Sequence, residues 1–386
     1  MPRPFGRSLD PLPEEDLGGY LLRLSAHLYM PLSTLVRALG LCDTGGYVIS
    51  RRMLLKSGTD LGTFAELARL TTAEARALTL REWNDRYQPI ETALALRRLN
   101  RDARYGTNGW LFARTPRHCP SCLAGDGSRI QKQYGGAWKR FWRLPIAFAC
   151  TEHQVFLSEG CGARHAERSG GIVLITSSAV SDLHPAQCRL PALGELGRGS
   201  RPCGNRLDRP AENPAIRPTQ RHLEIQRRIN DQFGADVAPS RAKRFLADIQ
   251  LISVFLNRLP HEHWGEIDDA VHDAIADTAG AYPEQSGSTI DAPPLDVVSS
   301  ATLFAAAIEI LADPQRQAAL LPLTYSKAKY TIALRALEKA WARSSPHCTP
   351  TVHENLVGAA TALWATYGEK HAHVLRSILD TVTPTR

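Results

Sequence analysis

Two pairs of metal-ligand residues lie in the middle of the chain, separated by 27 residues. Cys119 and Cys122 form the first pair and Cys150 and His153 the second, with two residues inside each pair. This spacing lets two side chains reach one ion from a tight turn, and two such turns complete a tetrahedral zinc site. Four protein ligands leave no position for water, so the pattern predicts a structural Zn2+ and disfavours four unrelated residues.

A second set of potential ligands follows in the same cysteine-rich segment. It consists of Cys161, His165, Cys188 and Cys203. Its spacing is irregular, and His184 is a competing ligand, so a second Zn2+ at these residues stays an open alternative. Cys42 and Cys348 are isolated in the sequence, which is typical of buried apolar cysteines.

The motifs of zinc and nucleotide enzymes are incomplete or absent. A nucleobase deaminase needs the motifs H-x-E and P-C-x-x-C. His165–Glu167 fits the first motif. Cys203 fits the first cysteine of the second motif, but Arg206 occupies the position of its other cysteine. His261–His263 is too tight for H-E-x-x-H, and no Gly-Lys dipeptide exists from which a P-loop could be built. We therefore expect a protein that is not an enzyme.

A helix, a tight break and a short helix open the chain. The break is Tyr29–Pro31, between a helix expected over Asp16–Leu28 and another over Leu32–Leu39. The first expectation rests on apolar residues spaced at i, i+4, i+7 and i+11, namely Leu17, Leu21, Leu24 and Leu28. This outline fits a DNA-binding helix-turn-helix, and it equally fits an ordinary packing unit.

The rest of the chain divides, by its glycine and proline content and its helical periodicity, into a loop-rich middle and a helical end. Further helices are expected over Phe64–Leu70, Thr72–Leu78 and Ile90–Leu99, and a strand over Gly171–Val180. Faces shared by Tyr330 to Trp341 and by Trp364 to Ile378 indicate helices near the end. The fold class expected is mainly α with small zinc-ribbon β elements. The expected domains are an N-terminal helix-turn-helix domain (1–115), a zinc-finger domain (116–209), a linker (210–218) and a helical C-terminal domain with an optional second helix-turn-helix (219–386).

Positive charge is concentrated in the first half of the chain. The formal net charge of +7 divides into +5 over residues 1–118, +4 over 119–213 and −2 over 214–386. A basic first half of the chain suits binding to phosphates or to another acidic partner, and such binding weakens as the salt concentration rises. The alternative is an arginine-rich surface that is only solvated. If DNA is bound, the residues expected to meet phosphate are Arg37, Arg51, Arg52, Arg227, Arg228, Lys243 and Arg244.

Composition places the chain among globular proteins of a reducing compartment. Hydrophobic residues make up 43% and charged residues 22%, and no apolar run has the roughly 18–20 residues of a membrane span. The N-terminus has no apolar segment of the kind found in secretory signals. We expect a cytoplasmic protein and no membrane partner.

Several of these segments together resemble the TniQ/TnsD family. The N-terminal run Pro11–Leu24 (PLPEEDLGGYLLRL) looks like the opening of that family. Cys119–Leu123 (CPSCL), Trp138–Pro145 (WKRFWRLP) and Cys150–His153 (CTEH) follow in the family's order. The resemblance covers about residues 8–205, and the C-terminal third matches only as a helical region.

The resemblance implies a non-catalytic adaptor that selects the target site in transposition, in the bacterial cytoplasm and in association with the nucleoid. Family members work with an AAA+ ATPase and a DDE-type transposase, and they read a DNA site or couple to a CRISPR effector ribonucleoprotein. Some members dimerise, and the basic and acidic parts of the C-terminal region would suit a homodimer. The alternative is a free-standing, zinc-containing DNA-binding regulator derived from such a transposon.

This chain departs from the family at the second set of cysteines. The family has Cys-x-x-Cys where this chain reads Cys161–Arg164, and the partner pair, Ser200–Cys203, also lacks one cysteine. Either the second site uses His165 and Cys188 instead, or it has lost its metal.

Overall fold

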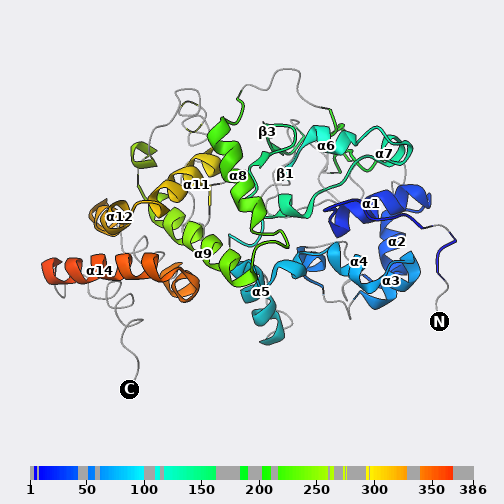
Figure 1. Cartoon of the computed structure of the whole chain (residues 1–386). Helices are drawn as coiled ribbons and strands as arrows, with labels where there is room; N and C mark the ends of the chain where they lie inside the picture. The colour runs from blue at the N-terminus through cyan, green and yellow to red at the C-terminus, as the bar shows by residue number, and fades with distance from the viewer. Residues whose placement is uncertain are drawn as a thin grey trace. The chain divides into compact units, whose positions relative to one another are not determined.

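The structure is a computed structural model of the 386-residue chain, drawn in Figure 1. The chain forms two compact units. Unit 1 consists of Met1–Trp83 and Phe112–Arg217, and unit 2 of Asn84–Leu111 and Pro218–Arg386. The structure describes residues 4–6, 8–41, 51–56, 61–99, 109–113, 117–161, 183–189, 202–209, 216–259, 261–264, 273, 275, 293–294, 296–327 and 340–367.

Short helices make up the first part of unit 1. They are α1 (Leu17–His27), α2 (Leu32–Ala38), η1 (Arg51–Leu55), α3 (Gly62–Ala68), α4 (Thr72–Ala77) and η2 (Leu80–Trp83). The expected helices of this part are therefore confirmed to within a few residues. Every residue of α1 from Leu17 to Ser25 is buried, so α1 is the central helix of the unit and not only an amphipathic surface helix.

Both ends of α1 are defined by individual residues. Asp16 is the N-cap, and its side chain accepts a hydrogen bond from Gly19 N at 2.6 Å. At the C-terminal end, Met30 N donates to Ser25 O at 3.0 Å, and Tyr29 takes a left-handed backbone conformation with φ of 52°. Glycine is the usual residue in that conformation, because a Cβ is strained there.

Where the structure describes it, the cysteine-rich part of unit 1 is built from short elements around two small sheets. Strand β1 (Arg117–His118) pairs antiparallel with β4 (Ser158–Glu159), and β2 (Ala149–Cys150) pairs with β3 (Val155–Phe156). Helices α6 (Pro120–Ala124) and α7 (Arg129–Tyr134) and the 3-10 turn η3 (Arg140–Arg143) lie between β1 and β2 in the chain.

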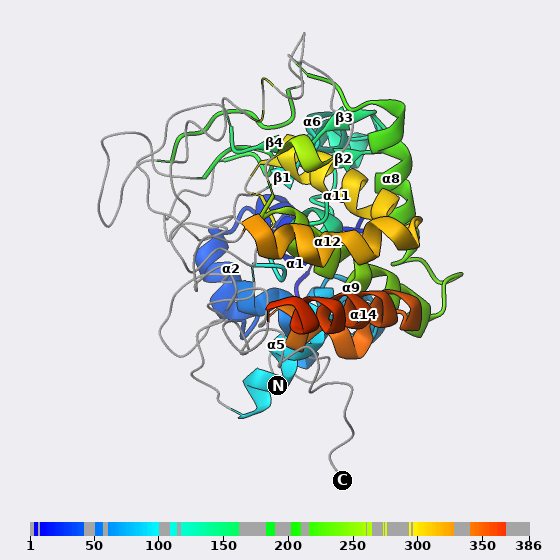
Figure 2. The same cartoon turned by 90° about the vertical axis from the view of Figure 1, so that its left-hand side faces the viewer.

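Unit 2 is a helical assembly. Its elements are α5 (Gln88–Leu99), α8 (Gln220–Asp231), α9 (Pro239–Leu256), η4 (His261–Trp264), α11 (Val297–Leu311), α12 (Pro314–Lys327), η5 (Ser345–His347) and α14 (Pro350–Tyr367). Helix α9 packs on α11, and α12 packs on α14 (Figure 2). The buried Phe255, Phe304 and Trp341 contribute large apolar side chains to the core of this unit.

The segment around α5 is joined to the region of α8 and α9 by polar contacts. Arg86 Nη1 donates to the carbonyls of Gln232 at 3.1 Å and Val237 at 2.6 Å, and Lys243 Nζ lies 2.8 Å from Glu91 Oε2. The first segment of unit 2 thus belongs to its fold although unit 1 residues follow it in the chain.

The mainly helical fold class with small β elements is confirmed. The helix-turn-helix assignments and the domain boundaries stay predictions. The strand expected over Gly171–Val180 lies outside the described residues, as does most of the two C-terminal faces. In the part of the chain that the structure describes, no helix has both the length and the apolarity of a membrane span.

Candidate metal centre

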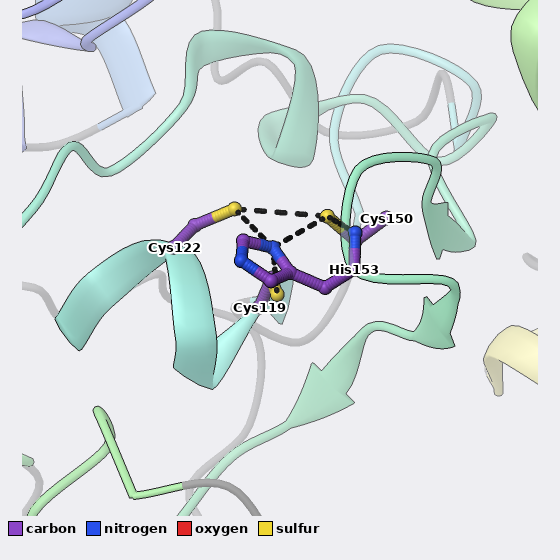
Figure 3. Close-up of side chains that lie close together, drawn as sticks. All are labelled: Cys119, Cys122, Cys150 and His153. Carbon is purple, nitrogen blue, oxygen red and sulfur yellow. Dashed lines mark hydrogen bonds between the residues drawn. The ribbon is translucent and has the colours of Figure 1, made fainter. Parts of the chain in front are cut away.

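The four ligands predicted from the first two pairs converge on one point (Figure 3). His153 Nδ1 lies 3.6 Å from Cys119 Sγ, 3.3 Å from Cys122 Sγ and 3.5 Å from Cys150 Sγ, and the Sγ atoms of Cys122 and Cys150 are 3.6 Å apart. A tetrahedron with Zn–S of about 2.3 Å and Zn–N of about 2.0 Å has edges of about 3.8 Å between sulfurs and about 3.5 Å between sulfur and nitrogen. The measured edges therefore fit a tetrahedral ion of this size.

Local backbone geometry holds each pair in place. Cys119 is the N-cap of α6, with Pro120 at the first helical position, so one short helical turn brings Cys122 beside Cys119. A Cβ on Gly136 would meet the carbonyl oxygen of Cys122 at 1.9 Å, so this close approach requires glycine. The second pair lies at the β2–β3 turn, where His153 N is 3.5 Å from Cys150 Sγ.

The thiols of the metal-free cluster share their protons unequally. Hydrogen bonds from Cys119 and Cys122 lower the pKa of Cys150, whereas hydrogen bonding to Cys119 and Cys150, together with burial, raises the pKa of Cys122. The cluster by itself therefore stabilises one thiolate and opposes the others. A divalent cation reverses this, because it favours the deprotonated form of each thiol.

One cation lies beside the cluster. Lys139 Nζ is 3.1 Å from Glu14 Oε2 and 3.5 Å from Glu152 Oε2. Burial lowers the pKa of Lys139, but attraction to Glu14 and Cys122 outweighs this effect and holds the pKa above its usual value. The charged ammonium group offsets the net negative charge that three thiolates and one divalent ion would carry.

The donor set could hold a metal ion, and it closes the coordination sphere. Three thiolates and one imidazole are typical of structural zinc sites, and four ligands leave no open position at which water or a substrate could bind. The arrangement can therefore hold parts of unit 1 together, but it has no place for metal-assisted catalysis.

A buried ion pair joins the N-cap of α1 to the turn that leads into the metal site. Arg143 Nε donates to Asp16 Oδ2 at 2.5 Å, and neither side chain is more than 1% exposed. The guanidinium of Arg143 also lies 5.3 Å from the ring centroid of Trp138. Asp16 and Arg143 belong to two of the segments that carry the family resemblance, but 127 residues separate them, and their spacing alone predicts no contact.

A second buried pair lies at the same end of α1. Arg23 Nε is 3.1 Å from Glu15 Oε1, with both side chains fully buried, and Arg23 Nη2 donates to Asp10 O at 2.9 Å. Gly19 allows α1 to approach Trp138, because a Cβ on Gly19 would meet Trp138 Cβ at 2.6 Å. The N-terminal motif therefore works as a packing surface for the cysteine-rich part of unit 1.

The second set of predicted ligands is brought together in part. The Sγ atoms of Cys161, Cys188 and Cys203 lie within 4.8 Å of one another, with 3.8 Å between Cys161 and Cys203. His165 lies outside the described residues. His184 Nδ1 accepts a hydrogen bond from Ala186 N at 3.1 Å and is not part of the group. The described residues thus bring together three of the predicted ligands, in a group that could hold a metal ion.

Of the two isolated cysteines, the structure describes only Cys348, which belongs to neither cluster. Cys42 lies outside the described residues. Cys348 is half-buried, its Sγ donates to Ser344 O at 3.2 Å, and burial raises its pKa. An inert thiol of this kind fits its isolated position.

The basic residues predicted to meet phosphate have different surroundings. Arg37, Arg228 and Arg244 are exposed and Arg227 is half-buried. The Arg228 guanidinium lies 5.3 Å from the ring centroid of Phe245, and Lys243 is paired with Glu91 at 2.8 Å. The side chains of Arg51 and Arg52 lie outside the described residues. Of the C-terminal set, Arg228 and Arg244 are best placed to meet an external phosphate.

Comparison with protein families gives one match. Residues 7–157 match the family model described as TniQ. The matched range contains both buried ion pairs and all four ligands of the first cluster. No curated protein and no solved structure matches the chain significantly.

Proposed function

Residues 7–157 of this chain are a TniQ domain, which indicates a transposon-associated role in target selection and DNA binding, and on this premise we propose that the protein is a non-catalytic adaptor. It links a target, either a DNA site or a CRISPR effector ribonucleoprotein, to an AAA+ ATPase and its transposase. It acts in the cytoplasm, at the nucleoid.

The family match carries the proposal, and the closed metal cluster supports it. We assign Zn2+ to Cys119, Cys122, Cys150 and His153, because the edges of this cluster fit a zinc tetrahedron. We assign a second Zn2+ to Cys161, Cys188 and Cys203, with His165 as its fourth ligand. Both ions would be structural, since each is enclosed by protein ligands.

Contact with duplex DNA is assigned to two basic regions. The first is Arg37 together with Arg51 and Arg52, and the second is the exposed Arg228 and Arg244 with their neighbours Arg227 and Lys243. Arginines of this kind bind phosphates without reading sequence. Replacing Arg228 and Arg244 with alanine should weaken DNA binding uniformly across sequences and lower the salt slope by about 2.

The adaptor role is tested by a tagged pull-down from the native host, washed at moderate salt and read by mass spectrometry. Recovery of an AAA+ ATPase supports the adaptor, and Cas proteins with guide RNA in the same sample identify the targeting route. Light scattering of the purified chain tests the homodimer.

A variant with a damaged metal site is the matched control. Cys122→Ser should lose the ATPase, whereas the Arg228→Ala, Arg244→Ala double variant should keep the ATPase and lose DNA. Recovery of chromosomal DNA without an ATPase from the unaltered chain would contradict the adaptor and favour the free-standing regulator.

A further inference from the structure

An open pocket of about 360 Å³ lies in unit 1, at the end of α1 and beside α7. These two helices are in contact (Figure 1). The pocket volume falls within the roughly 300–1,000 Å³ of small-ligand sites. The residues that line it are Ala26, Tyr29, Gln133, Tyr134, Leu183, His184 and Pro185.

An aromatic side chain without a packing role lies at this pocket. Tyr29 is 76% exposed, so its ring adds little to the core of the unit. Its φ of 52° is the left-handed conformation that glycine favours, so the fold itself would be served better by glycine. Strained, exposed residues of this kind point to a role outside folding.

The other walls of the pocket are fixed by hydrogen bonds. Tyr134 Oη lies 3.0 Å from His27 Nδ1, and the two rings meet edge to face. His184 Nδ1 accepts from Ala186 N at 3.1 Å. The exposed Gln133 side chain presents an amide, which can both donate and accept hydrogen bonds, at the same pocket.

Helix α7 contributes Gln133 and Tyr134 to the pocket, and its two charged residues are cationic. Arg129 and Lys132 are exposed on α7, Arg129 one helical turn before Gln133. Asp126 precedes the N-terminus of α7 and accepts hydrogen bonds from Ser128 N and Gln131 Nε2.

One further carboxylate interacts electrostatically with a residue that lines the pocket. Asp208 interacts with His184, and it is paired with Arg206. Its negative charge is therefore offset, and the surroundings favour an anionic occupant.

We propose that this pocket binds one unpaired nucleotide of a single-stranded nucleic acid. The base stacks on the Tyr29 ring, Gln133 bonds to the edge of the base, and Arg129 and Lys132 hold the flanking phosphates. Aromatic stacking beside a cationic track is how proteins bind single strands without strong sequence preference. This site is separate from the duplex contacts assigned to Arg228 and Arg244.

The test is titration of the full zinc-loaded chain with a short labelled strand that carries one 2-aminopurine. Stacking on Tyr29 should quench the 2-aminopurine fluorescence. Tyr29→Gly should abolish the quenching and weaken binding about tenfold, since stacking of one base contributes about that factor. Tyr29→Trp should retain both, and Ile130→Ala, which removes an exposed apolar side chain of α7 outside the pocket, should change neither.

A thermal melt separates a role of Tyr29 in binding from damage to the fold. Tyr29→Gly removes the left-handed strain, so its Tm should be equal to or about 2 °C above that of the unaltered chain. Parallel titrations with DNA and RNA strands distinguish the two sources of the nucleotide. The proposal is overturned if Tyr29→Gly binds single strands as tightly as the unaltered chain, or if it weakens binding to a blunt duplex equally. The ATPase pull-down does not involve this pocket, so the two proposals can fail independently.

Discussion

Replacing Asp16 with asparagine should destabilise unit 1 by about 3 kcal/mol, although the side chain changes by only one atom. Asparagine caps a helix as well as aspartate, so the hydrogen bond to Gly19 N is kept. What is lost is the negative charge opposite Arg143, whose guanidinium is buried and faces Trp138. Leaving one member of a buried ion pair without its partner costs about 3–5 kcal/mol. Such a loss is a large part of the roughly 5–15 kcal/mol that stabilises a typical domain.

The assay is urea unfolding of the zinc-loaded chain, with hydrogen exchange in α1 used to assign the transition of unit 1. A double-mutant cycle with Arg143→Met then isolates the pair, because methionine removes the buried cation and keeps much of the side-chain volume. Each single variant should cost about 3 kcal/mol, and the double variant should cost less than their sum by about 2 kcal/mol or more.

Glu82→Gln is the matched control within the same unit. Glu82 pairs with Arg140 at 3.0 Å but is 33% exposed, so breaking this pair should cost about 0.2–1 kcal/mol. A cost below about 1 kcal/mol for Asp16→Asn, or strict additivity in the cycle, would refute the view that this pair joins α1 to the approach to the metal site.

Three further predictions concern other parts of the structure. Gly19→Ala should lower the stability of unit 1 by about 1–3 kcal/mol, because its Cβ would meet Trp138 Cβ at 2.6 Å; Gly62→Ala, with nothing within 4 Å of the added Cβ, should cause no loss in the same thermal melts. Chelation of zinc should remove hydrogen-exchange protection from residues 117–159 and leave α14 protected, since structural zinc contributes roughly 10 kcal/mol or more; continued protection of 117–159 in the metal-free chain would show that the cluster folds without an ion. Burial lowers the pKa of His222 from 6.5 to about 4, so the unfolded chain binds this proton first and unit 2 should lose up to about 3 kcal/mol as the pH falls from 6.5 to 4. His222→Gln retains a partner for the Thr219 cap and should flatten that part of the curve in pH-dependent unfolding; an unchanged slope would assign the acid sensitivity to another group.

The helices of unit 1 and the first cluster could be predicted from the sequence because their signals are local. A repeat of apolar residues predicts α1 wherever the rest of the chain lies. Ligands two residues apart carry their own geometry, so Cys119, Cys122, Cys150 and His153 could be assigned as one group.

The buried polar contacts were not predictable in this way. Asp16 and Arg143 are charged, and their types alone suggest surface positions. Only the fold brings them together, and a pairing over 127 residues has no periodic signal. The exposure of the Tyr29 ring was not predictable either, because a tyrosine fits a break between two helices whether its ring is buried or exposed.

Unit 2 is built from two separate stretches of the chain, and this has a consequence for the order in which its helices are synthesised. Helix α5 leaves the ribosome before α8 and α9, and about 120 residues separate Leu99 from Gln220. At roughly 5–20 residues per second this delay is on the order of ten seconds. During it, Ile90 and Leu94, which are buried in the finished fold, have none of the α8–α14 helices beside them. Translation that stops before Gln220 would therefore leave α5 as an exposed apolar segment, and we expect such nascent chains to depend on chaperones.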